Sequence, residues 1–417
     1  INTAYGDIYL SDFVRLDGYA AAPTDFGQYD SNNLWVPKDP TDIVTANKGT
    51  NGFWLDFADS SDLGNDVSYS GLSVGTDNSW TATNIGAANS VLDRPADDAD
   101  TDVGNYATIS TIFTREVNSF SSPAGAITTS KGALTVDFAN GGTNPLCIVT
   151  QPLLPGNKYH FEWESNAWGS SATQPWAGVW LIPLSSLSTV ADINNTSGGG
   201  YAWYISTWTP NRGIGSNTAF NGSTLSSLSS SDAWTIGAIM SVDIDMSTIG
   251  STDIISKKDG TTIATDSSLA FLDEPYFICP QVQSNGTNRT WNGTFNFGQH
   301  TFSTTPVTDH GKVLTTRIAE PTVKNGKDYF FPMIYDGNGS SQRVGDFIPF
   351  TDSHTVNNSA RFDDADSNYL SRTLVTPTSA YKWTFSTWFK RGKLGDMTFI
   401  GQGDYNAQYT ALYFNGS

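Results

Sequence analysis

Two pairs of carboxylates stand at alternate positions of strand-like segments, a spacing that glycoside hydrolysis can use. Glu162 and Glu164 lie in KYHFEWESN (158–166), and Asp243 and Asp245 lie in SVDIDMS (241–247). Side chains at positions i and i+2 of a strand share one face, and retaining hydrolases hold their acid and nucleophile about 5 Å apart. The competing interpretation is a set of solvated strand faces. We favour it, because these carboxylates provide no convincing pair of acid and nucleophile.

Clusters of aspartate suggest a second kind of chemistry, the binding of a hard cation. One lies in DDADTDVGN (97–105) and another in FDDADSN (362–368). Calcium takes several carboxylate oxygens, but Ile109 stands where an EF-hand loop would have its closing glutamate. The predicted calcium ligands are Asp98, Asp100 and Asp102; the second cluster consists of Asp363, Asp364 and Asp366. The alternative for both is a solvated turn, and no other cofactor is expected.

Aromatic residues beside polar ones provide the best indication of ligand binding. WYISTWTPNRG (203–213) and NGTNRTWNG (285–293) combine rings with Asn, Thr and Arg. Aromatic stacking together with polar hydrogen bonds suits a sugar ring. The predicted ligand-binding residues are Trp203, Tyr204, Trp208, Arg212 and Trp291. The alternative is that the tryptophans belong to the core. The four histidines are scattered and have no spacing typical of a metal site or a catalytic triad.

The elements that carry these residues are predicted to be strands. Apolar and polar residues alternate with period two in 159–164, 240–246 and 381–386, whereas AGVWLIPL (177–184) and PYFICP (275–280) are apolar on both faces. Five Glu against 36 Asp disfavours helices, because Asp prefers caps and turns. The predicted fold class is all-β: an antiparallel β-sandwich with very little helix.

Several segments resemble known modules. RFDDADSNYLSRTLVTPTSAYKWTFSTWFKR (361–391) resembles the opening strands of the concanavalin-like, laminin-G-like modules of tailed-phage structural proteins, especially those of marine phages. IYLSDFVRLDGYAAAPTDFGQYDSNNLWVPKDP (8–40) resembles the closing strands of such a module, and GTNGFWLDF (49–57) the segment that follows it. The stretch from about Phe120 to Phe302, with KYHFEWESN near its start and GTFNFGQHTF (293–302) at its end, resembles a SPRY-type, jelly-roll-like sandwich. None of these motifs is a catalytic signature.

This resemblance implies an order of five segments. Residues 1–50 are expected to be the C-terminal part of a laminin-G-like module, and 356–417 the N-terminal part of another. Residues 116–303 are expected to form the SPRY-like sandwich, with 51–115 and 304–355 as connectors. Because neither end can close a sandwich alone, the two should pair with each other, with a neighbouring subunit or with chain outside this sequence. The half-modules and the initial Ile1 favour a piece of a longer protein.

Composition narrows the function further. A net charge of −19 makes nucleic-acid binding improbable, and no apolar run is long enough for a membrane span. Cys147 and Cys279 are expected to be buried free thiols rather than a disulfide. The resemblance implies a non-enzymatic protein of the virion surface, in a fibre, spike or capsid, with other virion proteins or copies of itself as partners. The alternatives are a carbohydrate-binding module that recognises a host surface glycan, and a glycoside hydrolase.

Overall fold

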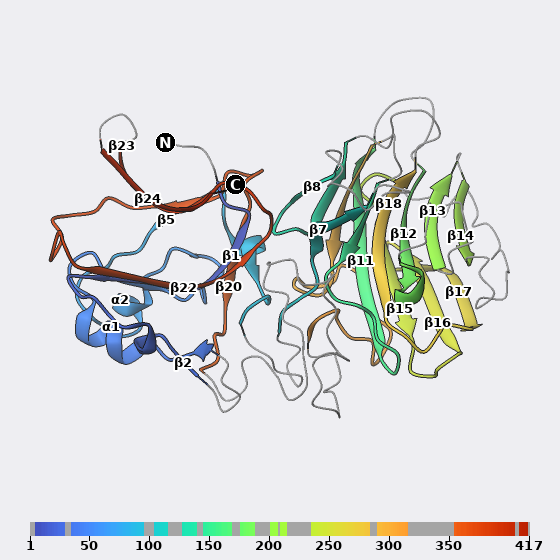
Figure 1. Ribbon diagram of the computed structural model, residues 1–417, viewed down its shortest axis with the longest axis horizontal. Coiled ribbons are helices and arrows are strands. Elements are labelled where there is room, and N and C mark those ends of the chain that lie inside the picture. The colour runs from blue at the N-terminus through green and yellow to red at the C-terminus, as the bar shows by residue number, and fades with distance from the viewer. Residues whose placement is uncertain are drawn as a thin grey trace.

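The computed structural model consists of two β-rich bodies that lie side by side (Figure 1). It describes residues 5–29, 35–95, 104–115, 127–139, 145–168, 176–187, 201–206, 209–214, 235–283, 290–315, 354–404 and 408–415. We name residues 5–95 and 354–415 the terminal unit and residues 104–315 the central unit. The two ends of the chain are thus interleaved in one body, as the blue and red strands of Figure 1 show.

The predicted all-β class is confirmed. In the described ranges the α-helices are α1 (Thr41–Asn47) and α2 (Val67–Ser70), and the remaining regular elements are strands and short 3-10 turns. All strand pairs in the sheets are antiparallel. No helix in the described part of the chain is long and apolar enough to cross a membrane.

The terminal unit is built on a five-stranded sheet whose central strand is β1 (Ile8–Asp17). On one side β1 pairs with β22 (Trp383–Arg391), and on the other with β20 (Ser359–Phe362) and β4 (Phe53–Leu55). β6 (Ser90–Val91) follows β20. Three possible partners for the two ends of the chain follow from the sequence. The structure confirms the first of them: the two ends pair with each other.

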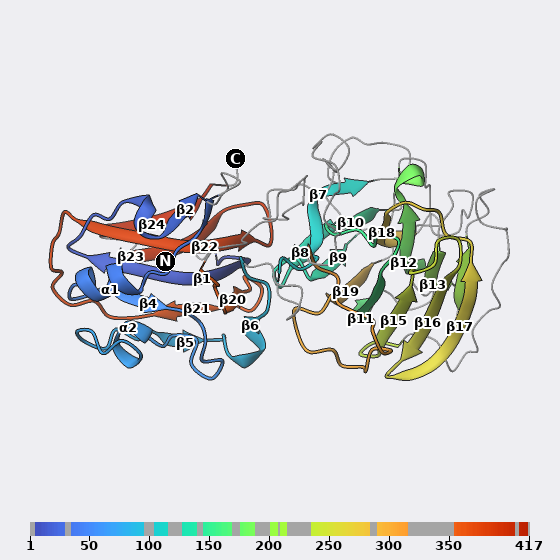
Figure 2. The ribbon, with the colours of Figure 1, turned by 90° about the horizontal axis from the view of Figure 1, so that it is seen from below.

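Three two-stranded sheets complete the terminal unit. Their strands are β2 (Gly27–Tyr29) with β3 (Trp35–Pro37), β5 (Thr81–Thr83) with β21 (Tyr369–Ser371), and β23 (Met397–Asp404) with β24 (Gln408–Phe414). The β23–β24 hairpin forms a second layer over the five-stranded sheet (Figures 1 and 2). Residues outside the hairpin, among them Leu63, Trp80 and Ile85, pack in the same core, so the hairpin is one part of the cover over the sheet.

The segment 51–115, expected to be a connector, contributes strands to both units: β4, β5 and β6 to the terminal unit and β7 (Ile109–Arg115) to the central unit. Side-chain hydrogen bonds fix the conformation of this segment in the terminal unit, and the spacing of apolar residues in the sequence does not reveal such bonds. The buried Asp66 carboxylate accepts hydrogen bonds from the backbone N–H of Trp54 (3.0 Å) and Ser68 (3.1 Å) and from Lys48 Nζ (2.9 Å). Of the second expected connector, 304–355, residues 304–315 and 354–355 are described. Residues 304–315 lie along the central unit, where the His160 N–H donates to the carbonyl oxygen of Gly311 (2.7 Å).

The central unit is a sandwich of two sheets. The six-stranded sheet has the order β14 (Thr209–Ile214), β13 (Tyr201–Ser206), β12 (Trp176–Pro183), β18 (Tyr276–Gln283), β10 (Leu146–Val149), β7. The seven-stranded sheet has the order β17 (Thr261–Leu269), β16 (Thr252–Lys258), β15 (Ile239–Asp245), β11 (Lys158–Trp168), β19 (Trp291–Asn296), β9 (Thr135–Phe138), β8 (Ile127–Ser130).

Both faces of the six-stranded sheet are apolar, as the sequence predicts for 177–184. Val179 faces the main core between the sheets, whereas Trp180 belongs to a smaller apolar cluster on the opposite face. Cys147 lies in the main core and Cys279 in the smaller cluster, and both are buried free thiols. Burial raises the pKa of both thiols well above the ordinary value, so neither is a reactive thiolate.

Buried polar contacts join the two units. The hydroxyl of Tyr9 donates to the carbonyl oxygen of Gly132 (2.8 Å). Lys390 Nζ, from β22, reaches Asp93 Oδ2 (2.6 Å), Asn105 Oδ1 (2.8 Å) and the carbonyl oxygen of Tyr106 (2.9 Å). Because these groups are removed from water, each depends on its partner for hydrogen bonding, which makes the junction specific.

Candidate functional site

The carboxylates considered for catalysis lie in a buried cluster on the outer face of the seven-stranded sheet. His160 and Glu162 come from β11, Asp243 from β15 and Lys257 from β16. His160 Nδ1 is 2.8 Å from Asp243 Oδ1, Lys257 Nζ is 2.8 Å from Asp243 Oδ2, and His160 Nε2 is 3.6 Å from Glu162 Oε1. Strand alternation does place these residues on one face, as predicted. The expectation of a solvated face is wrong, because all four side chains are buried.

The segment after β19 covers this face and accounts for the burial. The backbone N–H groups of Ser303 and Thr304 donate to the two oxygens of Glu162 (2.9 and 2.7 Å), and that of Val307 donates to Asp243 Oδ1 (2.9 Å). Lys257 Nζ donates to the carbonyl oxygen of Thr305 (2.8 Å). The cluster therefore attaches residues 303–307 to the sheet.

The electrostatics of the cluster do not suit hydrolysis. Although burial opposes ionisation, hydrogen bonds from His160 and Lys257 lower the pKa of Asp243 to about 2. The pKa of Glu162 is also lowered, because hydrogen bonds from His160, Ser303 and Thr304 outweigh burial, and the pKa of His160 is raised by its two carboxylate partners. A glycoside hydrolase needs one carboxylic acid whose pKa is raised. Here both carboxylates are held ionised, which is the pattern of a structural charge cluster.

The other two carboxylates, Asp245 and Glu164, lie outside the buried cluster and are partly exposed. Asp245 forms an ion pair with Lys158 (2.8 Å), and this contact together with hydrogen bonds from Ser247 lowers the pKa of Asp245 to about 2 against the effect of burial. Glu164 is partly exposed on β11. Asp245 is thus engaged in a surface pair and is held ionised.

Two of the predicted sugar-stacking residues are core residues, and that part of the prediction is wrong. Trp203 is 1% exposed; its Nε1 donates to Ser256 Oγ (2.8 Å). Trp291 is fully buried, stacks on Phe138 and donates from Nε1 to Ser165 Oγ (3.0 Å). Both are inward residues of strands, β13 and β19, although the polar residues around Trp291 resemble a loop.

For the other residues predicted to bind a ligand or calcium, the described structure does not show a binding site. Tyr204 and Arg212 belong to β13 and β14 and pair with Asn211 and Trp203 respectively, but the structure describes only their backbone. Trp208 lies outside the described residues, as do Asp98, Asp100 and Asp102.

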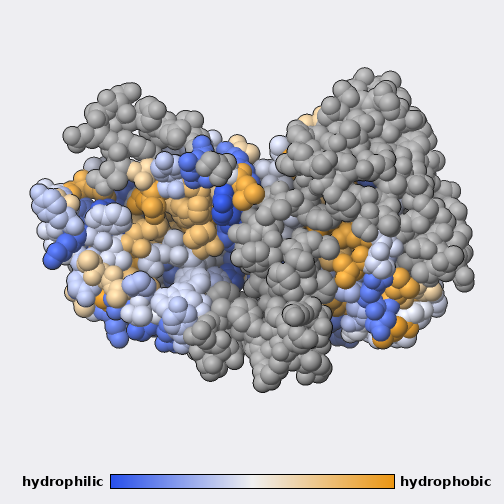
Figure 3. Space-filling model, viewed as in Figure 1, coloured by the Kyte–Doolittle hydropathy of each residue, from blue (hydrophilic) through white to orange (hydrophobic). Residues whose placement is uncertain are grey.

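The terminal unit exposes aromatic residues that the ligand prediction did not include. Along β22, Trp383, Phe385 and Phe389 share the face below the β23–β24 hairpin. The exposed fraction is 56% for Trp383 and 49% for Phe389, and Phe389 contacts Phe399 and Phe414 of the hairpin. We call the five residues of this paragraph the open aromatic face. Figure 3 shows apolar residues gathered on this side of the terminal unit.

The open aromatic face is only partly covered by the hairpin. Phe399 and Phe414 contact Phe389, whereas Trp383 remains more than half exposed. The alternation of aromatic residues in 381–389 predicts a strand with one apolar face, which needs a cover.

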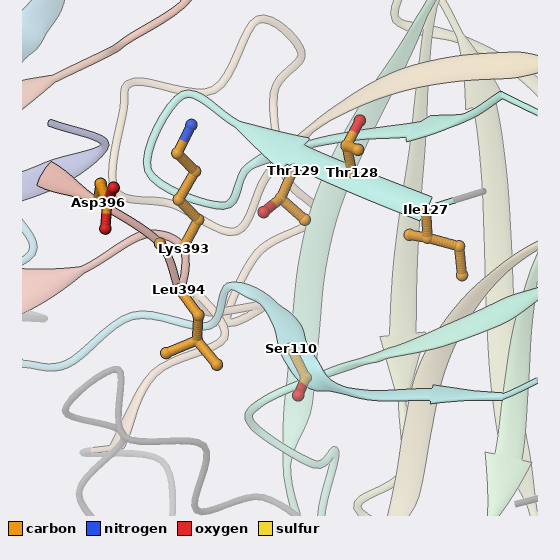
Figure 4. A pocket seen from close by; sticks show the side chains of 8 residues that line it. Ser110, Ile127, Thr128, Thr129, Lys393, Leu394 and Asp396 are labelled. Atoms are coloured by element: carbon orange, nitrogen blue, oxygen red, sulfur yellow. The ribbon is translucent and has the colours of Figure 1, made fainter. Parts of the chain in front are cut away.

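A pocket of about 410 Å³ lies between the two units. Its walls are Ser110, residues 127–129 of β8 and the turn 393–396 of the terminal unit (Figure 4). The lining offers hydroxyls, one lysine and one carboxylate, Asp396. It therefore does not hold the two carboxyls that glycoside hydrolysis needs.

The second aspartate cluster of the sequence is partly buried beside this turn. Asp363 is fully buried and its Oδ1 accepts a hydrogen bond from the Ala365 N–H (3.0 Å); Asp364 forms an ion pair with Lys393. Burial raises the pKa of Asp363, although backbone N–H groups offset part of the rise. Asp366 is exposed and takes no part in the group. The sequence predicts either a cation site or a solvated turn for this cluster. The burial of Asp363 contradicts a fully solvated turn.

Comparison with known proteins gives distant likenesses only. No family model matches the chain, and no curated protein matches it. Among solved structures, the SPRY domain of human HERC1 is 15% identical, with 46% of this chain and 99% of that chain covered and a TM-score of 0.30. Peanut lectin in complex with a 9-mer peptide is 12% identical, with 44% and 96% covered and a TM-score of 0.28. The endo-beta-1,4-glucuronan lyase from the fungus Trichoderma reesei is 9% identical, with 47% and 98% covered and a TM-score of 0.31. The chain is thus an antiparallel β protein with distant structural similarity to SPRY and lectin-like sandwich domains.

Proposed function

We propose that this protein is a non-enzymatic structural component of a phage particle, and that its terminal unit is an assembly surface. The observation that supports the proposal best is the open aromatic face, on which Trp383 is 56% exposed and Phe389 49% exposed. Contiguous exposed apolar surface of this kind is typical of a protein interaction site.

The occupant that fits this surface is a β-strand of another virion protein, with apolar residues at alternate positions. Among the described residues, β22 has no strand partner on its outer side and the β23–β24 hairpin pairs with no further strand. An added strand would satisfy free backbone groups at these edges and cover Trp383 at the same time. A second copy of the same chain fits less well, because two chains of net charge −19 repel one another.

The absence of catalysis is part of the proposal. Glu162, Asp243 and Asp245 are occupied by hydrogen bonds and ion pairs that hold the sandwich together. Their lowered pKa values favour the ionised form, so none is suited to donate a proton to a leaving group. We expect purified protein to release no reducing sugar from polysaccharides.

The assembly surface is tested on particles. We expect immunogold electron microscopy to find the protein in the virion, and a Trp383→Ser, Phe389→Ser double variant to be incorporated at least about tenfold less than the wild type, because a hot spot of two large aromatic residues is lost. Tyr19→Ser, at a residue 40% exposed in the same unit, is the matched control and should be incorporated normally. Protein absent from the virion, or equal incorporation of the double variant, would contradict the proposal.

Binding of a host surface glycan is a second candidate function, favoured by Tyr381, which is 94% exposed two residues before Trp383. Two exposed rings in one segment can stack on sugar rings. If this function holds, Trp383→Ala weakens binding to purified host polysaccharide by about 1–3 kcal/mol, measured by isothermal titration calorimetry. Tyr29→Ala, at a residue 65% exposed on β2, should bind as the wild type does. Failure of the wild type to bind any host polysaccharide excludes this candidate and leaves the assembly proposal untouched.

A further inference from the structure

We propose that Asp7, Asp363 and Asp364 form a calcium site at the junction of the two units. Asp7 immediately precedes β1, and Asp363 and Asp364 immediately follow β20, the neighbour of β1 in the sheet. One carboxylate oxygen from each residue lies within 4.8 Å of the others. Two oxygens bound to one Ca²⁺ at roughly 2.4 Å are at most about 4.8 Å apart, so the separation suits a shared calcium ion.

The state of Asp7 is the second observation that points to a cation. Its side chain is fully buried, and Oδ1 accepts a hydrogen bond from the backbone N–H of Gly132 in the central unit. Oδ2 is buried and has no hydrogen-bond partner among the described residues. A buried carboxylate oxygen without a partner is costly, and a bound cation would satisfy it.

The charge balance leads to the same conclusion. Three carboxylates meet here, and Lys393, paired with Asp364, is the cation that the described structure places in contact with them. Three negative charges and one positive charge leave two negative charges, which a single divalent cation neutralises. Burial of Asp7 and Asp363 limits how far solvent can screen the repulsion between their carboxylates.

The location gives the site a structural role. Gly392 donates from its backbone N–H to the carbonyl oxygen of Asp7 (2.7 Å), so the turn that follows β22 also meets the cluster. A cation would hold together the start of β1, the end of β20 and, through Asp7 and Gly132, the central unit. It would therefore stabilise the pairing of the two chain ends and the contact between units.

Calcium titration of the full chain tests the site. After removal of divalent cations with EDTA, calorimetry with CaCl₂ should show binding to the wild type. Asp7→Asn and Asp364→Asn should each raise the dissociation constant about tenfold or more, because each removes a charged ligand. Asp366→Asn is the matched control: this exposed aspartate lies two residues from Asp364 but outside the cluster. It should bind calcium as the wild type does.

Thermal unfolding with CaCl₂ and with EDTA provides a second measurement. Calcium should raise the unfolding temperature of the wild type and of Asp366→Asn, and should leave Asp7→Asn unchanged, since a ligand stabilises only a protein that binds it. If Asp7→Asn does not fold, Asp364→Asn, at a partly exposed residue, carries the comparison. The proposal is overturned if the wild type binds no calcium, or if both variants bind it as tightly as the wild type does, which would place the ion at other residues.

Discussion

Replacing Lys390 with methionine is expected to lower the free energy of unfolding by about 3–5 kcal/mol, because it breaks a buried ion pair and leaves the other partner charged. Lys390 Nζ bonds to Asp93, Asn105 and the carbonyl oxygen of Tyr106 at the junction between the units. Methionine keeps most of the apolar stem but supplies no donor. Asp93, which is buried, would then have lost its cationic partner.

Urea denaturation followed by tryptophan fluorescence measures this loss. Lys382→Met is the matched control, since Lys382 is exposed just before β22 and its removal should change stability by less than about 0.5 kcal/mol. The double variant Lys390→Met, Asp93→Asn should recover part of the loss, because the unpaired charge is gone. Equal midpoints for Lys390→Met and Lys382→Met would show that the junction contributes little to stability.

Replacing Asp243 with asparagine is expected to have an effect of similar size in the central unit. The variant leaves His160 and Lys257 without the carboxylate that both contact, which costs about 3–5 kcal/mol for a buried pair. Asp273→Asn is the matched control, because Asp273 is exposed after β17. Thermal unfolding should separate the two variants clearly, and an Asp243→Asn protein as stable as the control would contradict the structural role of the cluster.

The same variant should change the pH dependence of stability. The pKa of Asp243 is lowered to about 2 in the folded state, so its contribution is fully present above the ordinary pKa near 4 and is lost as the pH falls towards 2. Glu162, whose pKa is also lowered, contributes in the same direction. Unfolding temperatures measured between pH 2 and pH 5 should therefore fall less steeply for Asp243→Asn than for the wild type.

The sequence predicts the fold class, and the need of both ends for strand partners, because these depend on local pattern; it leaves open whether the ends pair with each other. Alternation along 159–164 and 381–386 identifies strands, and an aromatic strand such as 383–389 needs a cover wherever it lies. Trp291 shows where this reasoning fails. Asn, Thr and Gly around it have the composition of a loop, but antiparallel pairing with β11 and β9 makes it an inward strand residue.

The candidate cation site could be predicted only in part, for a different reason. Asp363 and Asp364 are visible as an acidic pair, but their third partner, Asp7, lies at the other end of the chain. The same holds for Glu162, whose burial depends on residues 303 and 304. Contacts between segments distant in sequence determine burial, and burial determines whether a carboxylate is a solvated turn residue, a structural ion or a ligand.

The central position of β1 has a consequence for the order in which the polypeptide acquires its structure during synthesis. β1 is made before all the other described strands, yet its partners β20 and β22 are made only after the whole central unit. In the meantime β1 can pair with β4 alone, and its remaining edge stays open. The described strands of the central unit all lie between residues 109 and 296 and pair only with one another, so this unit can fold first and the terminal unit follows. Such pairing between distant segments is slow and exposes strand edges to aggregation, so cotranslational chaperones have most to protect in β1 and β4.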